Sequence, residues 1–487
     1  MNASLNPDRS EWDVIVVGGG PPGEVAAQYA TQYSGLEAVI VERELLGGEC
    51  SFWACMPSKG LLRPIELVSN ARDLPGVTGA TVDVAAVLAR RDEIVKHHDD
   101  GSQVGWATGA GIDVVRGHAR LAGEKSVTVT ASDGTTRTLT ARHAVVLATG
   151  TRANVPPIDG LREARPWISR DASNLHEVPR RVVIVGGGVV ACEAATWLHG
   201  LGTEELTIVE GGPRLLGRTE PFAGEIVAAG FTAAGISVRT GTRVAAVSRP
   251  DVNDAGEGLL HGGEVTVTLD DGSLVVADEI LVAAGRTPNS DDVGLDSVGL
   301  TPHGYLAVDD RLTVPGHDWL YVVGDLNGRA LLTHMGKYQG RIAGDVIAAR
   351  AAGTPLDGYF YTDRATVPQV TFTDPEVGSA GLTEAQARDA GIDVETAEFD
   401  LAALAGTYLL RENYTGRAKL VIDRASDTLV GVTFVGTGIA ELVHSATVAI
   451  VGKVPVGDLW HAVPSYPTVS EAWLRLLETL DRQRRGK

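Results

Sequence analysis

Cys50 and Cys55 are separated by four residues in a Gly-rich segment that reads GGECSFWACMPSKG over residues 47–60. Two cysteines this close, in a chain with only one other, are typical of catalytic or metal-binding sites. In a regular helix their Cα atoms would lie roughly 8.6 Å apart, whereas a disulfide requires about 7 Å or less. The helix start that the Gly-Gly pair and Pro57 indicate must therefore be distorted if the two cysteines are bonded.

The surroundings of these thiols leave three interpretations open. A helix N-terminus lowers the pKa of a thiol and favours the thiolate, which suits redox chemistry. Buried packing thiols and a metal site are the alternatives. No nearby His or further Cys completes a coordination shell, so we predict no metal. Cys192, the third cysteine of the chain, is expected to be a packing residue on a helix.

A glycine motif precedes this segment and could bind phosphates. It lies between a predicted strand over residues 12–17 and a helix that runs to about residue 32, and its glycines are Gly18, Gly20 and Gly23. The G-x-G-x-x-G spacing permits a tight turn and close approach of a pyrophosphate to a helix N-terminus. Glu42 ends the next predicted strand, where its carboxylate can accept hydrogen bonds from ribose hydroxyls. This order of elements predicts a dinucleotide site.

The same pattern returns 168 residues later, with strands over 181–185 and 205–210. Its turn contains Gly186, Gly188 and Ala191. Glu210 follows at the same offset as Glu42, and a carboxylate there favours the 2′-hydroxyl of NADH and repels a 2′-phosphate. Arg214 and Arg218 follow closely and keep NADPH as an alternative. Two dinucleotide sites in one chain indicate that hydride passes from one cofactor to another.

The duplication extends beyond the turns. Each unit is followed by an alternating hairpin with an Asp-Gly turn, over residues 127–140 and 265–276. Each hairpin is followed by an apolar strand that ends in Ala-x-Gly, over 145–150 and 280–285. Residues 361–487 have a different pattern of antiparallel strands and a helix over 438–452. They are expected to form a separate α+β domain.

Length and charge limit the remaining possibilities. A chain of 487 residues predicts about three domains. Its formal net charge of −20 argues against binding nucleic acid or an anionic membrane surface. The polar N-terminus lacks an apolar signal core, and no run of 18 apolar residues occurs. We therefore expect a cytoplasmic protein that binds neither nucleic acid nor membrane.

Taken together, these segments resemble the class I pyridine nucleotide-disulphide oxidoreductases, which include dihydrolipoamide dehydrogenase, glutathione reductase and mercuric reductase. GGECSFWACMPSK is similar to the redox-active disulfide segment of that family. The resemblance extends from about residue 11 to residue 475. Further segments that carry it are ATG at 148–150, GRTPN at 285–289, YVVGD at 321–325 and TDPEVGSAGLTE at 373–384.

The resemblance implies an α/β fold with two Rossmann-like dinucleotide-binding domains and a C-terminal α+β dimerisation domain. The expected FAD-binding domain is discontinuous, over 11–157 and 288–358, with an NAD(P)H-binding domain over 158–287 and a dimer-interface domain over 359–487. Each active site of the expected homodimer borrows from the partner's C-terminal domain. Besides the two turns, Glu42 and Glu210, the resemblance assigns cofactor binding to Thr149, Gly150, Gly285, Arg286 and Asp325.

The resemblance also implies a path for electrons. They pass from NADH to FAD, then to a Cys50–Cys55 disulfide, and finally to a small-molecule acceptor. Cys50 is the interchange thiol in this scheme, and Cys55 is the thiol that contacts the flavin. Lys59 and Glu193 match an ion pair that the family places beside the flavin and the nicotinamide.

One segment departs from the family. Its reductases of dithiol substrates carry His-Pro-Thr-x-x-Glu, whereas this chain reads YPTVSE, so Tyr466 replaces the acid/base histidine and Glu471 is retained. A tyrosine titrates near pH 10 and is a poor base at neutral pH. His461 could act instead only if the backbone rearranged. No cysteine follows Cys192, so a C-terminal redox pair is lacking.

The acceptor therefore stays open after the resemblance is considered. A disulfide or another thiol-reactive compound is one hypothesis. A quinone, dye or metal ion is a second. A third, from a different class, is a non-enzymatic redox-responsive flavoprotein or a subunit of a complex.

Overall fold

The computed structural model describes residues 9–356 and 366–486, and these form two compact units. The first unit contains the described residues of Met1–Pro57, Asp92–Ala153 and Arg286–Arg364, and the second contains those of Ser58–Arg91, Asn154–Gly285 and Ala365–Lys487. The predicted domain boundary at residues 358/359 and the polar N-terminus over residues 1–8 lie outside the described residues. No helix among the described residues is long and apolar enough to cross a membrane.

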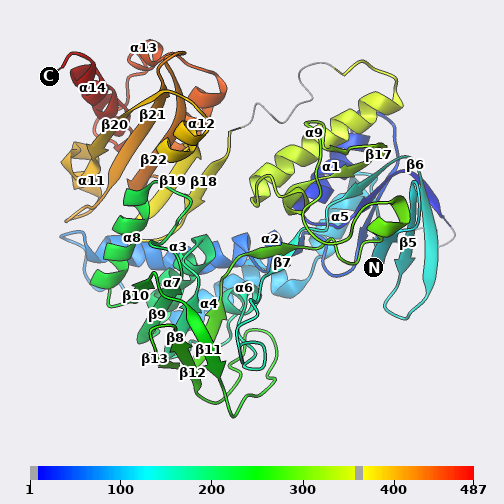
Figure 1. Ribbon diagram of the computed structural model, residues 1–487, viewed down its shortest axis with the longest axis horizontal. Coiled ribbons are helices and arrows are strands. Elements are labelled where there is room, and N and C mark those ends of the chain that lie inside the picture. Colours follow the sequence, from blue (N-terminus) through cyan, green and yellow to red (C-terminus); the bar gives the residue numbers. More distant parts are fainter. Residues whose placement is uncertain (1–8, 357–365, 487) are drawn as a thin grey trace. The chain divides into compact units, whose positions relative to one another are not determined.

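The first unit is built on one mainly parallel sheet (Figure 1). Its central strands are parallel and lie in the order β17-β6-β1-β2-β3, which is typical of a dinucleotide-binding fold. Their bounds are β1 Glu11–Val17, β2 Ala38–Glu42, β3 Asp113–Arg116, β6 Thr136–Leu147 and β17 His317–Val322. Antiparallel strands at the margins are β4 His118–Leu121, β5 Ser126–Thr130 and β16 Thr313–Val314.

Helices α1 (Pro21–Thr31) and α9 (Thr333–Ala351) pack together over one face of this sheet, near the shorter helix α5 (Gly101–Gly109). Glycines of α9 let the two backbones touch. An added Cβ at Gly336, Gly340 or Gly344 would lie only 2.5–2.6 Å from atoms of α1. This contact fixes the N-terminal ends of both helices at the carboxyl edge of the sheet.

Strand β6 differs from the sequence-based expectation. The second strand of the hairpin over 127–140 and the apolar strand that begins at residue 145 were predicted as separate elements, but they form one strand of 12 residues. Its first half pairs with β5 and alternates between exposed and buried residues, and its last four residues are buried between β1 and β17. The change from alternating to continuous burial explains why the pattern resembled two strands.

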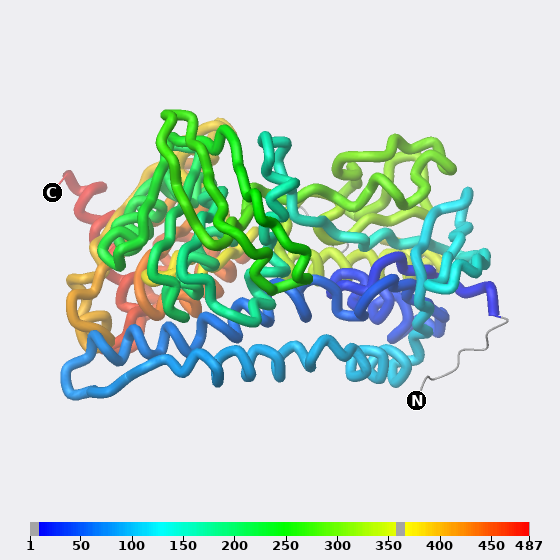
Figure 2. The backbone as a smooth tube through the Cα atoms, turned by 90° about the horizontal axis from the view of Figure 1, so that it is seen from below, coloured from blue at the N-terminus to red at the C-terminus, as the bar shows by residue number. Residues whose placement is uncertain are grey.

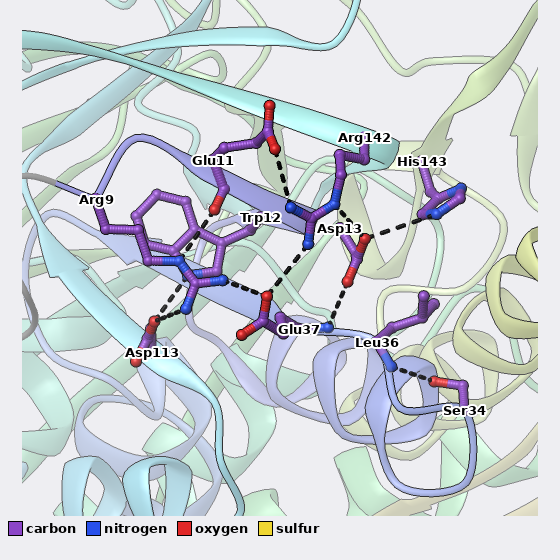
Figure 3. Close-up of polar contacts among 10 residues, drawn as sticks. All are labelled: Arg9, Glu11, Trp12, Asp13, Ser34, Leu36, Glu37, Asp113, Arg142 and His143. Atoms are coloured by element: carbon purple, nitrogen blue, oxygen red, sulfur yellow. Dashed lines mark hydrogen bonds and ion pairs between the residues drawn. The ribbon is translucent and has the colours of Figure 1, made fainter.

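A network of charges joins the first residues of β1 to the middle of β6 and to the residue before β2, at the opposite end of β1 from the glycine turn (Figure 3). Asp13 accepts a hydrogen bond from Nε of Arg142 at 2.6 Å and from the backbone N–H of Glu37 at 2.8 Å. Arg142 also pairs with Glu11 at 2.9 Å. The hydrogen bond from Arg142 is the main cause that lowers the pKa of Asp13. Strands β1, β2 and β6 thus share one ionic tie.

The second unit repeats the parallel arrangement in a smaller sheet of order β10-β9-β8-β14. The strands are β8 Arg181–Val185, β9 Glu205–Glu210, β10 Ser237–Thr240 and β14 Glu279–Val282, and the helices beside them are α6 Ser169–Ser173, α7 Val189–Leu201 and α8 Pro221–Ala233. The predicted second hairpin is present within an antiparallel sheet of β11 Val244–Ser248, β12 Val265–Leu269 and β13 Leu274–Ala277. The expected duplication of a strand–turn–helix–strand element is confirmed.

Two long helices, α3 (Cys55–Arg72) and α4 (Val84–Ile94), form a hairpin whose residues 58–91 belong to the second unit (Figure 2). Arg90 on α4 donates to the carbonyl of Gly60 on α3 at 3.2 Å. Leu61, Leu62 and Ile65 enter the same apolar core as α7. Gly200 on α7 lies directly against Ile65, since an added Cβ there would approach its Cγ2 to 2.4 Å.

The C-terminal part of the second unit is an antiparallel sheet of order β18-β19-β22-β21-β20, as the α+β pattern predicted. Its strands are β18 Pro368–Thr371, β19 Glu376–Gly381, β20 Val394–Asp400, β21 Arg417–Asp423 and β22 Thr428–Gly436. The accompanying helices are α10 Glu384–Asp389, α11 Ala405–Leu410, α12 Leu442–Val451, α13 Val456–Leu459 and α14 Ala472–Arg484. Apolar residues of α12 and α14 share one core with the sheet.

The Asp13 network gives a pH-dependent prediction. Because the folded-state pKa of Asp13 is lowered, its stabilisation is present above the unfolded value near 3.8 and is lost as the pH falls through the folded-state pKa. We expect Asp13→Asn to lower stability at pH 7 by about 1–2 kcal/mol. This difference from the parent should shrink as the pH falls below the unfolded value and through the lowered pKa of Asp13.

Thermal unfolding midpoints measured from pH 7 downward test this expectation. Glu11→Gln is the matched control, because it removes an exposed partner of the same arginine and should cost little. A deficit in Asp13→Asn that stays constant with pH would contradict the electrostatic explanation.

Candidate active site

The first glycine turn joins β1 to α1 and leaves a bare helix N-terminus. Gly18 has a φ of 102°, and an added Cβ there would lie 2.5 Å from the carbonyl oxygen of Ala148. At Gly23 a Cβ would lie 2.1 Å from the carbonyl oxygen of Gly18. Gly20 caps α1 without a side-chain hydrogen bond, and the nearest atom to an added Cβ is 3.9 Å away. The free N–H groups and the open space at Gly20 fit a pyrophosphate.

Glu42 lies at the end of β2 and is buried against this turn. Its Oε2 accepts from the backbone N–H of Gly19 at 2.7 Å, and its Oε1 accepts from that of Glu44 at 2.8 Å. The sequence predicted Glu42 as a ribose ligand. The structure adds a second role, because the same carboxylate fixes the glycine turn.

The helix is interrupted between the two cysteines, as a disulfide between them would require. Helix α2 (Gly48–Phe52) ends before Trp53, whose φ of −132° is not helical, and α3 begins at Cys55. Both cysteines are free thiols, partly buried, and they share a hydrogen bond. That bond, and then burial, raises the pKa of Cys50, while Thr333 and Lys337 on α9 act in the opposite direction.

Thr333 is the main residue of this site that the sequence did not indicate. Its Oγ1 lies 3.3 Å from Sγ of Cys55, although the two residues are 278 positions apart in the sequence. Thr333 begins α9, so the helix places a hydroxyl and its N-terminal end beside the thiols. Only the fold could reveal this contact, because nothing in the local sequence marks a threonine as a partner of a distant cysteine.

A polar cluster surrounds Asp325, which the resemblance assigned to FAD. Thr151 begins the short strand β7 (Thr151–Ala153), which pairs with β15 (Arg286–Pro288). Oγ1 of Thr151 donates to Asp325 at 2.7 Å, and Arg286 donates to the carbonyl of Thr151 at 2.6 Å. Burial is the main cause that raises the pKa of Asp325, and the Thr151 hydroxyl and Arg286 oppose it. The structure therefore gathers Asp325 and Arg286 beside one threonine.

Residues 149–150 link the end of β6 to the same region. Oγ1 of Thr149 donates to the carbonyl of Asn289, and the Asn289 side chain donates back to the carbonyl of Thr149, both at 2.9 Å. Gly150 has a φ of 66° and accepts from the backbone N–H of Asn289 at 3.0 Å. These reciprocal bonds hold the chain at the point where it leaves the first sheet.

The second glycine turn, in the second unit, repeats the geometry of the first. Gly186 has a φ of 116°, and an added Cβ would lie 2.5 Å from the carbonyl oxygen of Ala283. Gly188 caps α7 without a side-chain hydrogen bond, and no atom lies within 4 Å of an added Cβ. Ala191 is buried where the third glycine stands in the first turn. Gly285, with a φ of 99°, follows β14 in this unit.

Glu210 ends β9 beside this turn, and its carboxylate accepts from the backbone N–H of Gly212. The two neighbouring arginines, Arg214 and Arg218, have different surroundings. Arg214 turns back into its own loop, where Nη2 donates to the carbonyl of Gly217 at 3.0 Å. Arg218 is exposed. Glu210 lies directly against the second turn, since an added Cβ at Gly187 would approach its Cγ to 2.8 Å.

Lys59 and Glu193 form the ion pair that the resemblance predicted, with Nζ 2.7 Å from Oε2. Glu193 is only 4% exposed, and its other oxygen accepts from the backbone N–H of Phe372 at 3.0 Å. The Lys59 ammonium also lies 5.0 Å from the centre of the Phe372 ring. Beside Glu193, Cys192 is fully buried, and burial raises its pKa, as expected of a packing thiol.

The segment that departs from the family lies in the second unit. Tyr466 is 74% exposed, and His461 is also exposed. Glu471 is only 5% exposed, and its Oε1 pairs with Arg475 at 2.7 Å. Its Oε2 is buried and has no hydrogen-bond partner among the described residues. The spacing of Glu471 and Arg475, four residues apart at the start of α14, could have revealed this pair from the sequence.

The comparisons with known proteins agree with this geometry. The family model described as pyridine nucleotide-disulphide oxidoreductase matches residues 12–342, and that of its dimerisation domain matches residues 367–477. A dihydrolipoyl dehydrogenase of Chlorobaculum tepidum is 34% identical over 95% of both chains. A mercuric reductase of Staphylococcus aureus is 28% identical over 97% of this chain and 83% of its own.

Among solved structures, the flavoprotein disulfide reductase RclA of Escherichia coli has the same fold. It is 22% identical, with a TM-score of 0.80 over 96% of this chain and 99% of its own. The chain belongs to the pyridine nucleotide-disulphide oxidoreductase family. It is an enzyme of a family that binds FAD and depends on a pyridine nucleotide, and it carries the family's dimerisation domain.

Gly20→Ala and Gly188→Ala form a matched pair of variants. Both glycines have ordinary φ values of −71° and −80°, and an added Cβ would meet no protein atom closer than 3.9 Å. Both variants should therefore fold normally, but the methyl group would occupy the space through which phosphates approach the helix. We expect Gly20→Ala to lose FAD during purification. Gly188→Ala should keep FAD, with a KM for the pyridine nucleotide raised about tenfold or more.

Flavin content, thermal midpoints and steady-state kinetics measure these effects. Normal flavin content in Gly20→Ala together with an unchanged KM in Gly188→Ala would show that neither turn approaches a phosphate.

Proposed function

We propose that this enzyme passes electrons from NADH through FAD to a redox-active pair, Cys50 and Cys55, and then to a small-molecule acceptor. The observation that carries the proposal is the hydrogen-bonded pair of thiols at a break between two helices. The same unit contains the first glycine turn. FAD supplies two-electron transfer between a reduced pyridine nucleotide and a dithiol.

The residues around the thiols support distinct roles for them. Cys55 begins α3 and contacts Thr333 at the N-terminus of α9, and both features favour a thiolate at Cys55. We propose that Cys55 is the thiol that contacts the flavin. Cys50 is assigned to thiol exchange with the acceptor. Lys59, which Glu193 holds in place, would stabilise negative charge that develops beside it.

We propose that FAD is held by the turn containing Gly18, Gly20 and Gly23, by Glu42, and by Thr149, Gly150, Arg286 and Asp325. NADH would occupy the turn containing Gly186, Gly188 and Ala191, with Glu210 at the ribose and Gly285 nearby. Glu210 supports NADH over NADPH because its carboxylate repels a 2′-phosphate. Arg214 supports the same preference, since its guanidinium is already bonded within its own loop.

We also propose the three-domain division stated above, with FAD-binding residues over 11–157 and 288–358, and a homodimer formed through residues 359–487. The matched dimerisation domain supports the homodimer. In such a dimer, Tyr466 and Glu471 would face the acceptor side of the partner's site.

The acceptor is the least constrained part of the proposal. Tyr466 is exposed and stands where the family has histidine, so this chain has no histidine there to form a dyad with Glu471 for proton transfer. These observations favour an acceptor that needs little acid/base assistance. Reduction of a quinone, dye or metal ion is therefore a second candidate beside reduction of a disulfide.

Anaerobic reduction of the holoenzyme tests the proposed path. Two-electron reduction by NADH should produce the long-wavelength absorption band that a thiolate gives beside oxidised flavin. Cys55→Ser should abolish this band, and Cys50→Ser should show it before any reductant is added. NADPH should reduce the enzyme at least about tenfold more slowly than NADH.

Cys192→Ser is the matched control and should leave the band unchanged, because Cys192 is buried away from solvent. If all three variants behave like the parent enzyme, Cys50 and Cys55 are not the redox pair.

The tyrosine at position 466 gives a separate prediction. The parent should reduce or oxidise lipoamide poorly while NADH still reduces its flavin rapidly. A positioned acid/base is worth about 10²–10⁴-fold in rate. Because Arg475 holds Glu471, Tyr466→His alone should raise lipoamide turnover less than Tyr466→His combined with Arg475→Gln.

Steady-state lipoamide assays beside quinone and metal-ion assays measure this effect. Robust lipoamide turnover in the parent that is lost in His461→Ala would identify His461 as the base and contradict the role given to Tyr466.

A further inference from the structure

The link between the two cysteines is held by a segment from elsewhere in the first unit. Phe52 and Trp53 lie between Cys50 and Cys55, and they are only 1% and 5% exposed. The Trp53 ring stacks on His98 with centroids 5.5 Å apart and an interplanar angle of 28°. Phe52 meets the Trp53 ring edge-on at 5.7 Å. The contact with His98 thus lies at the break between α2 and α3, on the link that joins the thiols.

We call residues 95–100 the clamp segment. It contacts the cysteine region at three places. Val95 is buried in one apolar cluster with Phe52 and Trp53. His98 stacks on Trp53, and the carboxylate of Asp100 accepts from the backbone N–H of Leu46 at 2.6 Å. The clamp segment therefore contacts the chain on both sides of α2, at Leu46 before the helix and at Trp53 after it.

The backbone of the clamp segment is strained. Lys96, His97 and His98 have φ values of 52°, 50° and 57°, a left-handed run of three residues that have side chains. Side-chain clashes make this conformation unfavourable for each of them. Such conformations persist only where the surrounding structure determines them, and they are concentrated at functional sites.

The His98 ring adds a second cost at the same contact. Its Nε2 is buried and has no hydrogen-bond partner among the described residues. A buried nitrogen without a partner loses its bonds to water and gains none in return. The strained backbone and the unpaired nitrogen both occur where the His98 ring contacts Trp53. The stacking and burial of Trp53 are the interactions that offset these two costs.

We propose that His98 is a positioning residue that sets the thiol–disulfide equilibrium of Cys50 and Cys55. This inference rests on the proposed function. The couple is the disulfide, which takes two electrons from the pyridine nucleotide through FAD together with two protons and becomes two thiols. The structure holds the stacked contact together with two unbonded sulfurs. In this proposal the contact favours that arrangement of the link and therefore the dithiol form. Loss of the ring shifts the equilibrium towards the disulfide.

The test equilibrates the holoenzyme with mixtures of oxidised and reduced dithiothreitol and counts free thiols by alkylation and mass spectrometry. We expect His98→Ala to shift the equilibrium constant about tenfold towards the disulfide, which is about 30 mV for a two-electron couple. His98→Phe keeps a ring on Trp53 and should stay within about twofold of the parent, a shift of about 9 mV by the same constant.

His97→Ala is the matched control. His97 has the same left-handed φ as His98, but its side chain is exposed and pairs with Glu93 at 3.0 Å. It should leave the constant unchanged. Trp53→Leu removes the other ring of the stacked pair, so it should give the same shift as His98→Ala. It also allows the test to be made if His98→Ala fails to fold. The double variant should show no further shift.

An equilibrium constant that is unchanged in both His98→Ala and Trp53→Leu would overturn the inference, as would a shift towards the dithiol. An equal shift in His97→Ala would overturn it too, because the strained turn and not the ring would then be responsible. If the parent shows no Cys50–Cys55 couple while its flavin is still reduced by NADH, the proposed function fails together with this inference.

Discussion

The structure depends on one steric constraint, which is that a helix N-terminus must remain bare where a buried parallel strand ends. In the first unit, Gly23 approaches the carbonyl of Gly18 so closely that even a methyl group would not fit. This contact brings α1 onto the end of β1 and directs its unbonded N–H groups outward. The same turn is tied to the neighbouring strand, because Glu42 at the end of β2 accepts a hydrogen bond from the backbone N–H of Gly19.

The fold was largely predictable from the sequence, because its elements depend on local pattern. Buried strands such as residues 181–185 and 205–210 have the bounds that their apolar runs indicated. The glycine turns were predictable because each glycine pattern lies between an apolar strand and a helix, with a carboxylate at the end of the next strand. Strand β6 was not, because the point where one strand becomes buried on both faces resembles the start of another.

The candidate site was predictable only where its residues are close in sequence or matched by resemblance. The close spacing of Cys50 and Cys55 identifies them as candidates from the sequence. The pair of Lys59 and Glu193 came from the resemblance, and the structure contains it as an ion pair. Thr333 could not be found, because its contact with Cys55 arises from the packing of α9 and from no local pattern. His98 escaped notice for the same reason, since nothing in its neighbourhood indicates that it stacks on Trp53.

The glycines along α9 have a consequence for how this enzyme can change. Because α1 and α9 touch backbone to backbone, no side chain between them can adjust their spacing. Helix α1 begins at the first glycine turn, which we propose holds the pyrophosphate of FAD, and helix α9 begins at Thr333 beside the thiols. The packing of the two helices therefore fixes the distance between the first glycine turn and the sulfur atoms of Cys50 and Cys55. Under the proposed electron path, exposed positions such as Tyr466 can vary without altering that distance, so the acceptor can change while electrons reach the thiols by the same route.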